Sequence, residues 1–231
     1  MDSKQWDEGY ETNPVQTVVP DAFFETQIAT LTPGTAVDLG CGSGGNAIAL
    51  AEKGWTVLGL DFSEKAIELA RKAASEKNLT NVDFQVVDCT SWKPDEQFDL
   101  VTSSFALPNK ELGRKVIAAG LAALAPNGTM LVSEWDASML PVWTMFTEED
   151  LFTVDDLVEC LPGLVIESKS VRVYDNPQNF RHNAKVAFVR AKKLDQWRLL
   201  TRRQHFRSNP PKGRYLSRFG GLQRTLPLRS V

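Results

Sequence analysis

A glycine-rich loop carries the clearest chemical signal in this sequence. The stretch "AVDLGCGSGGNAIAL", residues 36–50, passes from a short apolar run through Gly40, Gly42, Gly44 and Gly45 into a helical pattern. Glycine lets another group approach the backbone closely, and the amides at a helix N-terminus attract negative charge. We therefore expect this loop to hold an anionic part of a ligand.

Two ligand classes are compatible with the loop. Gly40, Gly42 and Gly45 satisfy the G-x-G-x-x-G fingerprint of dinucleotide binding, and Asp61, 21 residues past Gly40, is placed to hold ribose hydroxyls. Asp38, however, lies two residues before Gly40, where its charge would repel a pyrophosphate. An acid at that position favours a ligand that presents a cation as well as an anion.

The hydrophobic pattern between about residue 20 and residue 162 predicts a parallel sheet covered by helices. The expected strands are 36–39, 55–60, 82–87, 98–103 and 130–134. The expected helices are 20–31, 45–53, 63–77, 110–124 and a short one within 152–163, with "APNG" at 125–128 closing the fourth. Two final strands, 164–173 and 184–190, have no helix between them, so we expect them to pair antiparallel.

Charge divides the chain into a body and a tail. Residues 194–231 hold nine Lys or Arg against one acid, whereas the rest holds 17 basic and 28 acidic residues. We expect one folded α/β domain over residues 1–193 and a basic Pro/Gly/Arg-rich tail over 194–231. Nucleic-acid binding depends on neutralising phosphates, so any such role is expected in the tail.

The remaining composition points away from membranes, metals and disulfides. No window approaches the roughly 18 to 20 apolar residues of a membrane span, and the N-terminus has no basic start followed by an apolar run. We expect a cytoplasmic protein without a membrane partner. Three widely spaced cysteines and two histidines argue against a disulfide framework and leave little to bind a metal.

Several segments together resemble the class I S-adenosylmethionine-dependent methyltransferases. "VDLGCGSG" resembles their motif I. Four later segments resemble, in the family's order, the end of the second strand, the end of the third strand, motif IV and the stretch that leads into the fifth strand: "VLGLDFSEKAIELAR", "FQVVDC", "FDLVTSSFAL" and "LAPNGTMLVSEWD". The resemblance covers about residues 6–191. It implies a Rossmann-like three-layer α/β sandwich with a seven-stranded, mostly parallel sheet in the order 3-2-1-4-5-7-6 and an antiparallel last strand.

The resemblance also implies S-adenosyl-L-methionine as cofactor, with a role for individual residues. Asp61 would hold the ribose hydroxyls, Phe62 would lie against the adenine, and Asp88 would accept from the adenine amino group. "WDEGY" resembles a segment that folds over the donor, which makes Trp6 and Tyr10 a lid. The cofactor-binding residues predicted in this way are Trp6, Tyr10, Asp38, Gly40, Cys41, Gly42, Gly44, Asn46, Asp61, Phe62, Asp88, Cys89 and Ser104.

The methyl acceptor is predicted less sharply. The chain looks most like the tellurite-resistance and thiopurine-type branch, which implies a small-molecule acceptor and an in-line displacement that depends on positioning. An apolar roof from Met139, Trp143, Met145 and Phe146 is one interpretation of the segment after residue 134, and simple core packing is the other. Whether a general base is needed stays open. The candidates are Glu134, Asp136 and His182.

Other interpretations remain for the whole chain and for single residues. The protein as a whole is alternatively a non-catalytic module with a nucleotide pocket that acts through its basic tail, or an NAD-dependent oxidoreductase. Asp61 is alternatively a helix cap, Asp88 a solvated loop acid and His182 an exposed loop histidine. We expect Cys41 and Cys89 to be small packing groups rather than reactive thiols.

Overall fold

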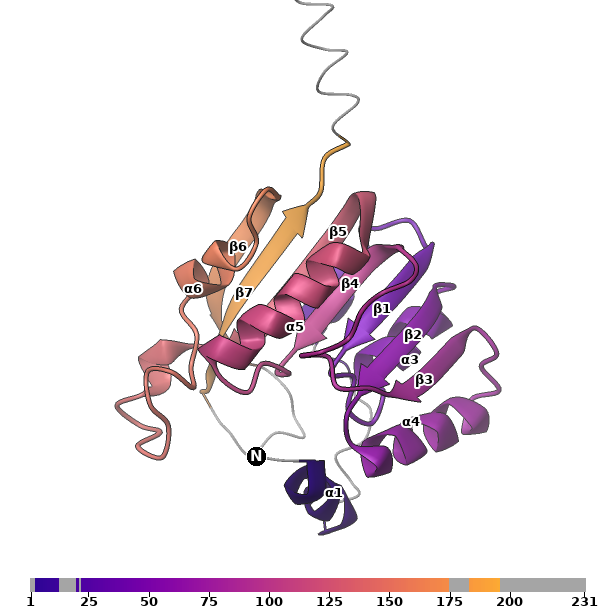
Figure 1. The fold of residues 1–231 in the computed structure, drawn as a ribbon, viewed down its shortest axis with the longest axis horizontal. Coiled ribbons are helices and arrows are strands. Elements are labelled where there is room, and N and C mark those ends of the chain that lie inside the picture. The colour runs from indigo at the N-terminus through magenta and orange to yellow at the C-terminus, as the bar shows by residue number, and fades with distance from the viewer. Residues whose placement is uncertain (1–2, 13–19, 21, 175–182, 196–231) are drawn as a thin grey trace, which may run out of the picture. The chain divides into compact units, whose positions relative to one another are not determined.

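The computed structural model describes residues 3–12, 20, 22–174 and 183–195 and contains one seven-stranded sheet. The strands are β1 (Thr35–Leu39), β2 (Thr56–Asp61), β3 (Val82–Val86), β4 (Phe98–Ser104), β5 (Leu124–Trp135), β6 (Val165–Val173) and β7 (Lys185–Lys192). Their order is β3-β2-β1-β4-β5-β7-β6, with β7 antiparallel to both of its neighbours (Figure 1). The predicted fold class and strand order are confirmed.

The sheet packs on both faces because successive side chains of a strand point to opposite sides. In β1, Ala36 belongs to one hydrophobic core and Val37 to the other, and β4 repeats this alternation with Leu100 and Val101. One core includes side chains of α2, α3 and α4, and the other those of α5 and α6. Three layers result, and the carboxyl ends of the parallel strands meet at one edge.

Most helices begin where the sequence predicts them. They are α1 (Ser3–Thr12), α2 (Ala22–Ile28), α3 (Gly45–Glu52), α4 (Glu64–Glu76), α5 (Lys110–Ala123), the 3₁₀ turn η1 (Ala137–Met139) and α6 (Val154–Glu159). The Ser63 hydroxyl caps α4 by accepting from the amide of Ala66 at 3.0 Å. Thr153 and Asp156 form the predicted capping box at the start of α6.

Some expected elements differ from those of the structure. The helix expected over 20–31 is confined to Ala22–Ile28, and the helix α1 and the 3₁₀ turn η1 were not expected. β5 begins at Leu124 rather than at residue 130, so "APNG" lies inside the strand instead of closing a helix. The reason is a tertiary contact: the Asn127 amide donates to the carbonyl of Lys193, and the Lys193 amide to that of Gly128.

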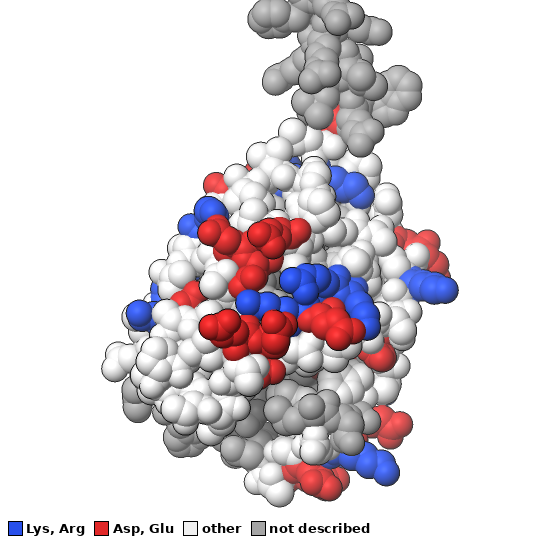
Figure 2. Space-filling model, turned by 60° about the vertical axis from the view of Figure 1, so that its left-hand side comes forward, with Lys and Arg blue, Asp and Glu red and all other residues white. Residues whose placement is uncertain are grey.

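The face around β6 and α6 carries charges of both signs. Figure 2 shows acidic and basic side chains next to one another there. The ion pairs Lys110–Asp156 at 3.0 Å and Lys169–Asp155 at 2.8 Å belong to this face. The charges of these two lysines are therefore matched by acids.

Residues 1–195 form one compact unit, and the second unit, 196–231, lies outside the described residues. The predicted domain boundary and the role of the basic tail therefore stay predictions. Within the described part of the chain, no helix is both long and apolar enough to cross a membrane.

Candidate functional site

The glycine loop, residues 40–44, connects β1 to α3 at the carboxyl edge of the sheet. Gly40, Gly42 and Gly44 have φ values of 69°, 54° and 91°, a left-handed backbone that favours glycine. The amides of Gly40 and Cys41 both donate to the carbonyl of Leu60, at 2.8 and 2.9 Å. These bonds tie the loop to the end of β2 and fix its shape.

Two side chains approach the glycine loop so closely that only glycine fits. A Cβ added at Gly40 would lie 2.3 Å from the Cβ of Ala106, which follows β4. A Cβ added at Gly42 would lie 2.7 Å from the hydroxyl of Tyr10 in α1. The loop is therefore flanked by the segment after β4 on one side and by α1 on the other.

Asp61 joins the end of β2 to the glycine loop. Its Oδ2 accepts from the Gly42 amide and its Oδ1 from the Ser63 amide, both at 2.9 Å. Burial raises the pKa of Asp61, although bonds from the backbone of Ser63, Gly42 and Phe62 act in the opposite direction. Because an ionised carboxylate has about four acceptor positions, Asp61 can anchor the loop and still accept from ribose hydroxyls.

Asp38 lies in the interior, beneath the loop. It is 2% exposed, and its Oδ1 accepts from the Thr102 hydroxyl at 2.6 Å. Burial raises its pKa to about 7, against hydrogen bonds from Thr102 and from the backbone of Ala47 that lower it. Asp38 therefore links β1, β4 and the first turn of α3, a structural role that the sequence did not suggest.

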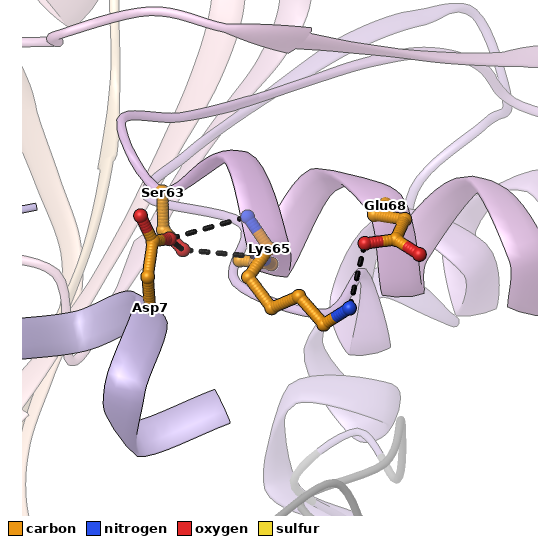
Figure 3. Close-up of polar contacts among 5 residues, drawn as sticks. Asp7, Ser63, Lys65 and Glu68 are labelled. Carbon is orange, nitrogen blue, oxygen red and sulfur yellow. Dashed lines mark hydrogen bonds and ion pairs between the residues drawn. The ribbon is translucent and has the colours of Figure 1, made fainter. Parts of the chain in front are cut away.

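Helix α1 lies on the start of α4 and brings Tyr10 to the loop. Figure 3 shows Asp7 pointing from α1 toward α4, where its Oδ1 accepts from the Ser63 hydroxyl at 2.5 Å and from the Lys65 amide at 3.2 Å. Burial, Asp61 and Cys41 together raise the pKa of the Tyr10 phenol, which stays protonated. Trp6 lies 6.3 Å from Tyr10, centroid to centroid, and is 36% exposed.

The segment after β3 contributes Asp88 and Cys89, which have different environments. Asp88 is exposed, and its Oδ1 accepts from the amide and hydroxyl of Thr90 at 2.8 and 2.7 Å. Cys89 is buried near Gly40, and burial raises the pKa of its thiol to about 12. Burial also raises the pKa of Cys41, so neither thiol is a thiolate at neutral pH.

The candidate bases Glu134 and Asp136 both bind backbone amides. Glu134 is 3% exposed, and its Oε1 accepts from the amides of Ala106 and Leu107, each at 2.8 Å. Burial raises the pKa of Glu134 to about 8. Asp136 is 5% exposed and caps η1 through the Ser138 amide at 3.0 Å. Neither carboxylate is open to solvent.

Five aromatic rings gather beside these carboxylates, and we call them the aromatic cluster. Its members are Phe105, Trp135, Trp143, Phe146 and Tyr174. All five are partly exposed, in contrast to the buried Met139 and the 85% exposed Met145. The predicted roof is thus split: Trp143 and Phe146 join the cluster, Met139 packs inside, and Met145 points outward.

The structure brings together most, but not all, of the predicted site residues. Asn46 lies in the first turn of α3, Phe62 follows Asp61 and Ser104 ends β4, all of them partly exposed at this edge. His182 lies outside the described residues. Among the residues that the structure describes, no group of three or more His, Cys, Asp or Glu could hold a metal ion.

The sequence analysis did not identify four residues that help to form the site: Asp7, Phe105, Ala106 and Trp135. Asp7 was visible only as one acid of "WDEGY", and Ala106 carries no chemical signal of its own. Besides the predicted roof residues Trp143 and Phe146, a tryptophan directly after the predicted strand 130–134 was a clue to the aromatic cluster.

Comparisons with known proteins agree with this geometry. Residues 36–128 match the model of a family described as "Methyltransferase domain". A curated relative from Mycobacteroides abscessus, 2-heptyl-1-hydroxyquinolin-4(1H)-one methyltransferase, is 35% identical over 111 residues, which cover 47% of this chain and 49% of that protein. The chain spans about half the length of the curated relatives that it matches.

Two solved structures share the fold. The chain is similar to an S-adenosylmethionine-dependent methyltransferase from Methanosarcina mazei, with a TM-score of 0.61, 22% identity and coverage of 77% of this chain and 99% of that one. It is also similar to TehB from Haemophilus influenzae, with a TM-score of 0.63, 18% identity and coverage of 81% and 67%. At such identities the likeness shows the fold alone.

Proposed function

We propose that the chain is a class I S-adenosylmethionine-dependent methyltransferase that transfers the methyl group of S-adenosylmethionine to a small-molecule acceptor. The observation that carries this proposal is the convergence of Gly42, Asp61 and Tyr10 at the carboxyl edge of the sheet. Open α/β sheets bind their ligands at this edge. The family match gives no support to the oxidoreductase or to the non-catalytic alternative.

The residues present fit such a donor. Gly42 lacks a side chain, and the Tyr10 hydroxyl lies 2.7 Å from where a Cβ at this position would be, so Tyr10 can lie directly over the loop that would hold the donor. The Asp61 carboxylate retains acceptor positions for ribose hydroxyls, and the exposed Asp88 at the rim is available to an amino group. Phe62 offers an apolar ring next to Asp61 for the adenine.

The chemistry needs little from the protein beyond geometry. S-adenosylmethionine supplies a methyl carbon already activated by the adjoining sulfonium. The chain's task is to align the acceptor in line with that carbon and to exclude water. Tyr10 covers the glycine loop from α1, and Glu134 holds the segment after β4 in place, so these two residues position rather than react.

The acceptor is proposed to be a small molecule because the relatives carry such names, among them the hydroxyquinolinone methyltransferase and a ubiquinone biosynthesis O-methyltransferase. The narrower likeness to the tellurite-resistance and thiopurine-type branch stays a prediction. At neutral pH Glu134 is mostly protonated because its pKa is raised to about 8, which disfavours it as a general base.

Titration calorimetry tests the donor. We expect heat with S-adenosylmethionine and with S-adenosylhomocysteine and none with NAD. Heat with NAD alone would refute the proposal.

Asp61→Asn probes the predicted ribose contact. It should weaken S-adenosylmethionine binding by about 1–3 kcal/mol, since a charged acceptor of two ribose hydroxyls is lost. Asp83→Asn, which removes an exposed acid from β3, is the matched control and should leave binding unchanged. A variant at Asp61 that unfolds more easily yet binds the donor with unchanged affinity would assign Asp61 to helix capping only.

A further inference from the structure

The aromatic cluster lies at the edge where an acceptor must meet the donor. Resting on the function proposed above, we propose that the acceptor is a planar aromatic compound, bound by stacking on the aromatic cluster with Trp135 at its centre. Among the described residues, the rings of Phe105, Tyr174 and Trp143 lie at 4.3, 5.2 and 5.3 Å from that of Trp135, centroid to centroid.

The cluster begins one residue away from the contact with the glycine loop. Ala106 packs against Gly40, and the preceding residue, Phe105, turns its ring onto Trp135. Trp135 is the last residue of β5, which neighbours β4 in the sheet. A ring stacked on the cluster would therefore lie beside the loop proposed to hold the donor.

The backbone at Phe105 is held in a conformation that bulky residues rarely adopt. Its φ is 56°, in the left-handed region. Three hydrogen bonds enforce it: the Phe105 amide donates to the Ser133 carbonyl at 2.9 Å, and the next two amides donate to Glu134. Strain of this kind is typical of functional sites, and here its effect is to direct an aromatic ring to the edge of the sheet.

The geometry within the cluster suits a flat partner. Trp143 and Tyr174 meet Trp135 edge to face, at 76° and 83°, while Phe105 is tilted by 30° to it. Edge-to-face packing restrains Trp135, so a ring binding to it loses little through reordering of the site. All the rings remain partly exposed, as a binding surface requires.

The acidic residues next to Trp135 in the sequence do not contribute to the exposed surface of the aromatic cluster. These residues, Glu134 and Asp136, are 3% and 5% exposed, and both bind backbone amides. They offer no accessible carboxylate to a cation. The cluster thus presents π-faces and ring edges, which an aromatic compound matches and a saturated ring of equal size does not.

Equilibrium dialysis of the full chain, saturated with S-adenosylhomocysteine, tests the inference. The probes are 2-naphthol and its saturated counterpart decahydro-2-naphthol, which has the same hydroxyl without the π-system. We expect 2-naphthol to bind about tenfold more tightly. Equal affinities would overturn the inference while leaving the proposed function intact, whereas failure to bind S-adenosylhomocysteine would overturn both.

Variants locate the binding surface. Trp135→Leu and the less central Trp143→Leu should each weaken 2-naphthol about fivefold, and Trp135→Phe should restore most of the loss. Phe23→Leu is the matched control, because Phe23 forms an edge-to-face pair with Phe188 in the other core. A loss of 2-naphthol binding in Phe23→Leu equal to that in Trp135→Leu would overturn the assignment to the aromatic cluster.

Discussion

Replacing Glu134 by glutamine separates its structural role from a catalytic one. The carboxylate is buried, and its Oε1 accepts two amides of the segment that follows β4. Glutamine keeps a carbonyl oxygen for these amides and cannot ionise. We expect Glu134→Gln to remain folded and to lose one specific property of the wild type, a fall in stability as the pH rises.

The sign and size of this effect follow from the raised pKa. The pKa of Glu134 moves from 4.5 to about 8 on folding, so between these values the folded state binds the proton and the unfolded state releases it. Stability is therefore lost as pH increases through this window, by about 1.4 kcal/mol per pH unit. Asp38, whose pKa is raised to about 7, adds a slope of the same sign in both proteins and cancels in the comparison.

Urea unfolding followed by tryptophan fluorescence measures this difference between about pH 5 and pH 8. The free energy of unfolding of the wild type should decline relative to Glu134→Gln across the window. Glu148→Gln, which removes an exposed glutamate, should follow the wild type. Parallel curves for the wild type and Glu134→Gln would refute the argument, because Glu134 would then ionise as easily in the folded chain as in the unfolded one.

Two further predictions concern the walls of the donor site. Gly40→Ala should weaken S-adenosylmethionine binding more than tenfold, because the added Cβ would lie 2.3 Å from the Cβ of Ala106. Gly54→Ala is the control: Gly54 also has a positive φ, 89°, but an added Cβ would have no atom closer than 4.0 Å, so this variant should cost only about 1–2 kcal/mol of stability. Calorimetry and urea unfolding check both, and equal losses of affinity would contradict the proposed contact. Asp7→Asn should weaken the contact between α1 and α4 by about 1 kcal/mol, which is measured as faster proteolysis of α1 and weaker donor binding. Glu8→Gln, on the exposed side of α1, is the control. Unchanged proteolysis in Asp7→Asn would contradict the role of Asp7.

The parts of the fold that follow from local patterning were predictable. Strands of alternating or continuous apolar residues, the Ser63 cap and the Thr153–Asp156 box are determined by neighbours in the sequence. Both caps and, apart from the start of β5, the strands appear where expected. The glycine loop was predictable for the same reason, because its positive φ values require glycine whatever surrounds it. The antiparallel pairing of the last two strands followed from the lack of a crossover helix.

Features that depend on distant contacts were not predictable. β5 extends back to Leu124 because residues 127 and 128 form hydrogen bonds with Lys193, which lies 65 residues beyond Gly128 in the sequence. Asp38 was expected to face a ligand's cation, yet Thr102, from a different strand, draws its carboxylate inward. The left-handed φ of Phe105 has no local cause in "SSFALP" and is imposed by Ser133 and Glu134 on β5.

The same contacts explain why one carboxylate affects two parts of the site. Glu134 holds the amides of Ala106 and Leu107; Ala106 closes on Gly40 of the glycine loop, and Phe105 closes on Trp135. A shift of this short segment would displace the wall of the donor site and the centre of the aromatic cluster together. If displacement in line with the donor is the main requirement, a buried residue that fixes both walls contributes more through position than it would by removing a proton. Glu134→Gln should accordingly retain methyl transfer, whereas Glu134→Ala, which leaves both amides without an acceptor, should lose it.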